Sequence, residues 1–201
     1  MRHARGQAGG WGSGPGRLLT LALMALGWTA VGAEPSTFTI LSGRSQIGYV
    51  SATQLGEFRG STSRVTGDIV FDVRDPGRTR LSVSVAPVGL KSDNALRDRH
   101  MYEDLLEAGR FPAATFASTE FRLDGSDTAG IRGTLLGILT LHGVDRPVTV
   151  PVRFAVDGET LRGEGTLSVN LTDFAMTPPR LLGLKVRNEV VVEIRLVAAS
   201  R

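Results

Sequence analysis

The chain has 201 residues, no cysteine, 41% hydrophobic residues and 21% charged residues, a composition typical of one folded domain. The absence of cysteine excludes disulfide bonds, cysteine-ligated metal sites, a thiol nucleophile and a cysteine-anchored lipoprotein. The formal net charge is +3, and three arginines within residues 1–33 account for all of it. The other 168 residues carry 20 basic and 20 acidic side chains. The sequence therefore predicts no nucleic-acid partner, because no net positive charge is left to neutralise phosphates.

Residues 1–33 have the three parts of a secretory signal peptide. A polar, positively charged segment comes first, Leu18 to Thr29 form an uncharged apolar stretch, and Ala30 and Ala33 are candidate last residues before cleavage. The apolar stretch is shorter than the ~20 residues that span a bilayer, which favours cleavage over the alternative, an uncleaved membrane anchor. We therefore expect a domain of residues 34–201 that is exported to the periplasm and has no membrane span after cleavage.

Alternation of apolar and polar residues dominates the rest of the chain and predicts strands with one buried face. The alternating runs are 65–73, 81–86, 148–156, 167–172 and 190–196, and further strand-like runs are 37–41, 44–53, 114–123 and 130–141. Turn residues separate them at 75–77, 124–127, 143–145 and 157–158. Strands at this spacing with hairpin connections predict an all-β protein, either a closed antiparallel barrel or a sandwich.

One segment, about residues 94–108, has the pattern of an amphipathic helix instead. Ser92, Asp93 or Asn94 can cap its first free N–H groups, and Gly109 is expected to stop it. A single short helix must bury its apolar face to persist. We therefore expect it to pack on an opening or a side of the barrel.

Several longer sequence elements resemble the YceI-like family of periplasmic proteins. The most specific are KSDNALRDRHMYEDLLEAGRFPAATFAST at 91–119 and GTLLGILTLHGVDRPVTVPVRF at 133–154. Three further elements agree: an early FTI…SQIGYV strand, a GEFRG…VTGDIVFDV hairpin, and GEGTLSVNLTDFAM before a valine-rich last strand. The resemblance covers about residues 37–198. It implies an antiparallel eight-stranded lipocalin-like barrel that encloses an isoprenoid or another long amphiphile.

The chain departs from the family pattern at two places. Leu105 and Leu106 stand where the family usually has a double phenylalanine, and Asn170-Leu171-Thr172-Asp173 replaces the usual lead into the DF-x-M element. These departures bear on the identity of the ligand more than on the fold.

An eight-stranded barrel is just wide enough to be filled by side chains or to hold one small ligand. Burial of an apolar tail gains ~0.8 kcal/mol per methylene, so a long chain needs no specific polar contact to be held. We predict that the ligand contacts thirteen inward-pointing apolar residues: Phe58, Phe71, Met101, Leu105, Phe116, Leu135, Leu139, Val150, Val152, Phe154, Val169, Phe174 and Met176. Ile69 is a further candidate for the inward face.

The polar residues predict no catalytic or metal site and no cofactor. After the signal peptide there are two histidines, whereas a metal site needs three or four ligands. We expect His100 to hydrogen-bond the helix in place and His142 to make a hydrogen bond within its turn. No Gly-x-Ser-x-Gly elbow is present. Four arginines are candidate contacts for an oxyanion head group, although exposed surface or a local ion pair is the favoured explanation for each one singly: Arg97, Arg99, Arg146 and Arg180.

These observations favour an exported, non-enzymatic binding protein whose partner is a small hydrophobic amphiphile such as an isoprenoid, quinone or fatty acid or amide. Two alternatives remain open. One is a barrel with a packed interior that acts as an envelope stress or interaction protein. The other is a hydrolase that acts on a lipid, with His100 or His142 as the base. The sequence also leaves a homodimer open.

Overall fold

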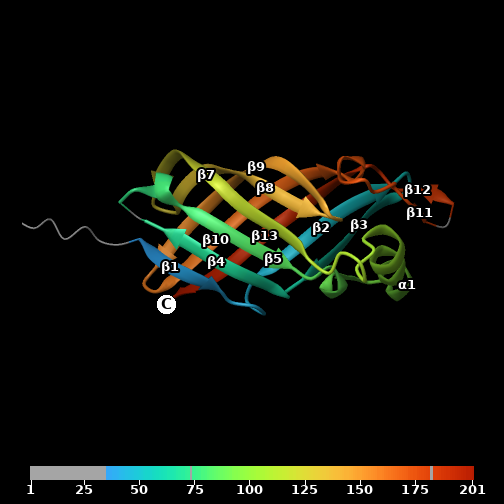
Figure 1. Cartoon of the computed structure of the whole chain (residues 1–201), viewed down its shortest axis with the longest axis horizontal. Coiled ribbons are helices and arrows are strands. Elements are labelled where there is room, and N and C mark those ends of the chain that lie inside the picture. The colour runs from blue at the N-terminus through green and yellow to red at the C-terminus, as the bar shows by residue number, and fades with distance from the viewer. Residues whose placement is uncertain (1–34, 73, 182) are drawn as a thin grey trace, which may run out of the picture. The chain divides into compact units, whose positions relative to one another are not determined.

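A computed structural model describes residues 35–201 except 73 and 182 (Figure 1). The predicted signal peptide, residues 1–33, lies outside the described residues. The strands are β1 Ser36–Ile40, β2 Gln46–Thr53, β3 Gly56–Thr62, β4 Val65–Phe71, β5 Arg80–Val85, β6 Lys91–Ser92, β7 Ala114–Asp127, β8 Gly130–Leu141, β9 Val144–Asp157, β10 Thr160–Asn170, β11 Arg180–Leu181, β12 Leu184–Lys185 and β13 Glu189–Ser200. The helical segments are α1 Ala95–His100, a π-helical turn at Met101–Leu105, and short 3-10 turns at Pro76–Arg78, Pro87–Gly89 and Leu171–Phe174.

Within this part of the chain, eight antiparallel strands close into a barrel in the order β1, β4, β5, β7, β8, β9, β10 and β13, and β13 pairs again with β1. The expected all-β barrel with one short helix is confirmed. Closure leaves no free sheet edge around this ring, and exposed edges are what invite aggregation. Figure 1 shows the ring of long strands, with α1 and the small β11–β12 sheet at the same end.

Strands β1 and β2 both run along β13, and β3 and β4 run along β2 and β1 respectively. The predicted GEFRG…VTGDIVFDV hairpin is therefore wrong, because β3 and β4 continue in one direction and pair with different neighbours. A tight hairpin needs residues with positive φ, and neither Ser63 nor Arg64 has one. Instead, the Arg64 amide donates to the Thr62 hydroxyl over 3.0 Å, and the chain continues forward.

The predicted turn at 124–127 is also wrong. Strand β7 continues to Asp127, with irregularities in its pairing to β8 at Ser118/Glu120 and Leu123/Gly125. An extra residue in one strand bends the strand without ending it. The reversal follows at Thr128 and Ala129, where the Asp127 carboxylate accepts a hydrogen bond of 2.8 Å from the Ala129 amide.

The helix begins as predicted but ends before residue 108. The Asn94 side chain caps it by accepting a 2.9 Å hydrogen bond from the Arg97 amide. The helical residues end at Leu105, and Glu107 has a left-handed φ of 42°, which takes the chain out of the helix before Gly109. The side chain of Asp98 is buried and accepts hydrogen bonds from the amide and the hydroxyl of Ser92, which fixes α1 to β6.

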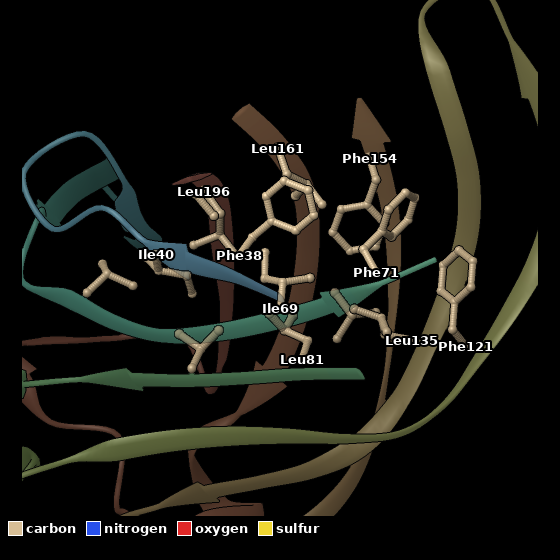
Figure 2. Close-up of a cluster of buried hydrophobic side chains, with 14 of the residues drawn as sticks. Phe38, Ile40, Ile69, Phe71, Leu81, Phe121, Leu135, Phe154, Leu161 and Leu196 are labelled. Atoms are coloured by element: carbon tan, nitrogen blue, oxygen red, sulfur yellow. The ribbon is translucent and has the colours of Figure 1, made fainter. Parts of the chain in front are cut away.

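Two clusters of buried hydrophobic residues lie inside the domain. Figure 2 shows the larger one, in which the Phe154 ring lies 5.8 Å from Phe71 and 5.9 Å from Phe121 between centroids. The smaller cluster joins the π-helical turn to the ends of β8 and β10, and its buried members are Leu106, Val169, Leu171, Phe174 and Met176. The larger cluster contains Phe38, Ile40, Val65, Ile69, Phe71, Leu81, Val83, Val85, Phe121, Leu135, Val150, Phe154, Leu161, Leu196 and Ala198.

Candidate ligand-binding site

The barrel contains a cavity of about 400 Å3 whose wall is almost entirely apolar. Side chains of β2, β5, β8, β9, β10, β13 and α1 line it. Pockets of roughly 300–1,000 Å3 with apolar walls and a few polar groups are typical of small-molecule sites. The interior of this barrel is therefore not completely filled by its own side chains.

Eleven of the thirteen residues predicted to contact a ligand lie in the cavity wall. These are Phe58, Met101, Leu105, Phe116, Leu135, Leu139, Val150, Val152, Phe154, Val169 and Met176. The other two, Phe71 and Phe174, point inward but are not part of the wall. Phe71 packs into the larger cluster against Phe154, and Phe174 packs into the smaller cluster. Contact of all thirteen residues with a ligand stays a prediction, and the cavity wall as described includes eleven of them.

The wall also contains residues that the sequence analysis did not single out. Several lie on strands whose alternation did mark an inward face, so the signal was present: Leu81, Val83, Leu167, Val190, Val192, Ile194 and Leu196. Others lie in short turns or loops without a periodic pattern: Leu90, Leu106, Pro179 and Val186. Periodicity cannot identify the second group, because a loop side chain reaches the wall only through the tertiary fold.

Val152 on β9 is a wall residue that lies between two glycines of the neighbouring strands. This residue pairs with Gly133 on β8 and with Gly165 on β10, so its direct neighbours on both strands lack side chains. Strand β9 pairs with β10 from Asp157 back to Val152, whose partner is Gly165. Residues 144–151 of β9 pair with β8 only. Pro147 and Pro151 lie in that part, where a strand tolerates the missing N–H of proline.

Arg97 is the most enclosed charged residue in the wall. Its side chain is only 15% exposed, and its guanidinium carbon lies 4.9 Å from the centre of the Phe58 ring. The guanidinium also pairs with Asp93, and its Nε donates to the Ser92 hydroxyl over 3.1 Å. Arg97 thus joins the helix to the apolar wall through a cation–π contact.

His100 and His142 have different roles from those expected. His100 is exposed at the cavity wall, and its Nδ1 lies 2.7 Å from the carboxylate of Asp104 on the same helical segment. This contact does not fix the helix to the barrel, because both partners lie on the helix. The docking role belongs to Asp98 instead.

The predicted local hydrogen bond of His142 is wrong, because its ring joins two distant segments. Nδ1 lies 3.2 Å from the Phe174 carbonyl oxygen, and Nε2 lies 3.0 Å from the Glu107 carboxylate. The Phe111 ring packs 4.5 Å from the imidazole. His142 has a left-handed φ of 52° in its tight turn. It holds together the segments after the helix and after β10.

The other arginines that were considered as head-group contacts divide between wall and surface. Arg180 is exposed and lies in the cavity wall. Arg146 donates to the Asp173 carbonyl oxygen over 2.8 Å, and Arg99 lies 3.7 Å from Glu103 on the exposed face of the helix. Only Arg97 and Arg180 of the four reach the cavity.

Burial raises the pKa of both tyrosines of the chain, Tyr49 and Tyr102. The nearby Asp98 carboxylate raises both further, while Arg97 opposes the rise at Tyr49. The Tyr102 hydroxyl donates to the Leu90 carbonyl oxygen, which ties the π-helical turn to the loop before β6.

Alkaline titration followed by phenolate absorbance is expected to show no tyrosine with the ordinary pKa of about 10. The folded-state pKa is raised, so the neutral phenols stabilise the fold fully below the unfolded-state pKa. That stability is lost as the pH rises above 10 and through the folded-state value. Circular dichroism measured in parallel should then show loss of structure together with ionisation. A phenol that ionises at about pH 10 while the barrel stays folded would contradict this expectation.

Two further properties concern the described residues alone. No group of three or more histidine, cysteine, aspartate and glutamate side chains among them could hold a metal ion. No helix in residues 35–201, apart from the two undescribed positions, is long and apolar enough to cross a membrane.

The closed antiparallel barrel and its apolar cavity of ligand size define the class: a lipocalin-like barrel of the kind that can enclose a hydrophobic molecule. The sequence matches the YceI-like domain over residues 38–198, and the chain therefore belongs to the YceI-like family. A UPF0312 protein of Enterobacter sp. (strain 638) is 30% identical over 171 residues, which cover 80% of this chain and 86% of that protein. A UPF0312 protein of Pseudomonas fluorescens Pf-5 is 33% identical over 138 residues, or 65% of this chain and 67% of the relative.

Solved structures show the same fold at lower sequence identity. BcnA of Burkholderia cenocepacia has a TM-score of 0.70 at 21% identity, and the match covers 80% of this chain and 99% of BcnA. A polyisoprenoid-binding domain of Saccharophagus degradans, implicated in plant cell wall breakdown, has a TM-score of 0.65 at 14% identity, and the match covers 84% of this chain and all of that domain.

Proposed function

We propose that this protein is an exported, non-enzymatic binding protein that carries one long-chain amphiphile, such as a polyisoprenoid, quinone, fatty acid or fatty amide, inside its barrel. The apolar cavity of about 400 Å3 carries the proposal. The polyisoprenoid binding described for a structural neighbour with the same fold supports it. The signal-peptide pattern of residues 1–33 favours the periplasm as the compartment, where such a molecule needs protection from water.

The cavity wall supplies the required affinity through burial alone. Ten methylenes that leave water gain ~8 kcal/mol, which is the binding free energy of a roughly micromolar complex. Loss of ligand freedom reduces this value, and each further methylene restores part of it. A chain of isoprenoid length therefore binds tightly without a large polar site.

The surroundings of the two histidines favour binding over catalysis. His100 is exposed and pairs with Asp104 on its own helical segment, whereas His142 lies outside the cavity wall. The imidazole of His142 is occupied at both nitrogens by Glu107 and the Phe174 carbonyl oxygen. A general base needs a ring nitrogen within reach of the proton it abstracts, and His142 provides none at the apolar wall.

Native mass spectrometry of the protein purified from its own cell envelope tests the proposal. We expect a stoichiometric adduct that solvent extraction releases and fragmentation identifies. An apo mass alone, without uptake of added isoprenoids, quinones or fatty acids, would overturn the proposal. That result would favour the alternative of an interaction protein with an empty barrel.

The variant Val152→Asp is expected to abolish uptake, because it places a carboxylate in the apolar wall beside the paired Gly133 and Gly165. The partly buried position gives the charge a route to water, so the barrel should stay folded. The matched control is Thr149→Asp, at an exposed position on the same strand. We expect the control to keep the adduct. Retention of ligand by folded Val152→Asp would show that the assigned inner face is wrong.

A further inference from the structure

The segment that contains the small β11–β12 sheet is basic. Residues 174–188 carry three basic side chains, Arg180, Lys185 and Arg187, and no acidic one. All three are exposed, and none forms an ion pair with an acidic residue in the part of the chain that the structure describes. The sheet lies at the same end of the molecule as α1 (Figure 1). Three cations at this end can therefore attract an anionic partner.

Two of these cations lie directly opposite each other. Arg180 pairs with Lys185 across β11 and β12, so both side chains are on the same face of the small sheet. Like charges in this position destabilise a strand pair, and a sheet of two short strands is only marginally stable by itself. A local arrangement that costs stability without compensation is expected at functional sites. An anionic partner would remove the repulsion.

An exposed leucine lies close to the basic segment. The Arg187 amide donates to the Ala52 carbonyl oxygen over 2.8 Å, which joins the segment to the end of β2. Leu55 follows in the turn between β2 and β3 and is 81% exposed. The acidic residue beside it, Glu57, is already 3.7 Å from the guanidinium of Arg59. Apolar side chains beside basic ones are typical of surfaces that bind the interface of an anionic membrane.

These four residues, Leu55, Arg180, Lys185 and Arg187, form what we call the basic patch. The patch lies where the cavity reaches the surface, because Arg180 and Leu96 are both exposed and both part of the cavity wall. The other three residues of the patch are not part of that wall. A molecule inside the cavity would thus meet Arg180 alone. A partner that also neutralises Lys185 and Arg187 must lie outside the barrel.

We infer that the basic patch docks the protein on an anionic lipid bilayer, with the opening of the cavity beside the membrane. This inference goes beyond the proposed function, since it identifies the surface from which the carrier takes up its amphiphile or to which it delivers it. Each basic residue beside an anionic bilayer strengthens attachment about fivefold. Three of them with one leucine give weak, reversible attachment, as a carrier that must leave the membrane again requires.

Co-sedimentation with lipid vesicles tests the inference, with the protein purified from its own cell envelope. One set of vesicles contains phosphatidylcholine alone, and the other contains equal parts of phosphatidylcholine and the anionic phosphatidylglycerol. We expect attachment to the anionic set to be more than about tenfold tighter, as three basic residues require. Added salt should release the protein, because it screens exposed charges.

The main variant is the double substitution Lys185→Glu with Arg187→Glu. The first change places a carboxylate opposite Arg180, so the β11–β12 pair should be kept or strengthened. We expect attachment to anionic vesicles to weaken at least about twentyfold. Leu55→Ser should weaken it severalfold through loss of the apolar contact. The matched control is Arg44→Glu, an exposed cation in the turn between β1 and β2, which should have little effect.

Three outcomes would overturn the inference. Equal attachment to both sets of vesicles would show that anionic lipid is not recognised. Equal weakening by Arg44→Glu would show an effect of net charge without a docking surface. Loss of the native ligand adduct from the double variant alone would assign Lys185 and Arg187 to the ligand site instead. Absence of an adduct from the unmodified protein would overturn the proposed function, whereas membrane docking is decided by the vesicles.

Discussion

Replacement of Gly67 by alanine is expected to prevent stable folding of the barrel. Gly67 has a φ of 143°, which residues with a side chain rarely adopt, and a Cβ there would lie 1.9 Å from the backbone carbonyl oxygen of Ser82 on the paired strand β5. The contact is with backbone, so no side-chain rotation relieves it, and the β4–β5 pairing must separate. We expect a loss of more than about 4 kcal/mol, against a total of roughly 5–15 kcal/mol for a typical domain.

The matched control is Gly109→Ala, which follows the helix. Gly109 lacks a left-handed φ, and a Cβ there meets no atom within 4 Å. Alanine at such a position reduces the freedom of the unfolded chain, so the control should be neutral or slightly more stable. Urea unfolding followed by circular dichroism measures both variants. A soluble Gly67→Ala protein with the wild-type midpoint would show that β4 and β5 do not pair in this register.

The barrel could be predicted from the sequence because its strands alternate between a buried and an exposed face. A period of two is a local property; β5 shows it over its whole length, 80–85, and β9 and β13 show it over part of theirs. The course of the strands was harder to predict. The segment Ser63-Arg64 resembles a turn in the sequence, yet it joins β3 to β4 without reversing the chain. The direction of these two strands is decided by their pairing, of β3 with β2 and of β4 with β1.

The candidate site was predictable only in part, for a related reason. Alternation tells which side chains point into a barrel, but it does not tell where along the barrel the interior is filled and where it is open. Phe71 and Phe116 have the same inward pattern, although the first lies in the core and the second in the cavity wall. The contact of His142 with Glu107 spans 35 residues and has no signal in the local sequence. Such features arise from the tertiary fold alone.

The pair Phe71→Ala and Phe116→Ala is expected to separate the core from the cavity. Phe71 is 2% exposed and packs against Phe154, so truncation should cost ~3–5 kcal/mol of stability. Affinity for an added isoprenoid should stay unchanged in the fraction that remains folded, because Phe71 is not part of the cavity wall.

Phe116 is only partly buried, and one side of its ring already faces the cavity. Truncation of Phe116 should therefore cost less stability than truncation of Phe71, because fewer packing contacts are lost. The same truncation should enlarge the cavity and so change the affinity for a ligand of a given tail length. Unfolding free energies and probe-displacement affinities for both variants provide the comparison. Reduced affinity in folded Phe71→Ala together with unchanged affinity in Phe116→Ala would reverse the two roles, and it would place the ligand in the part of the barrel that Phe71 now fills.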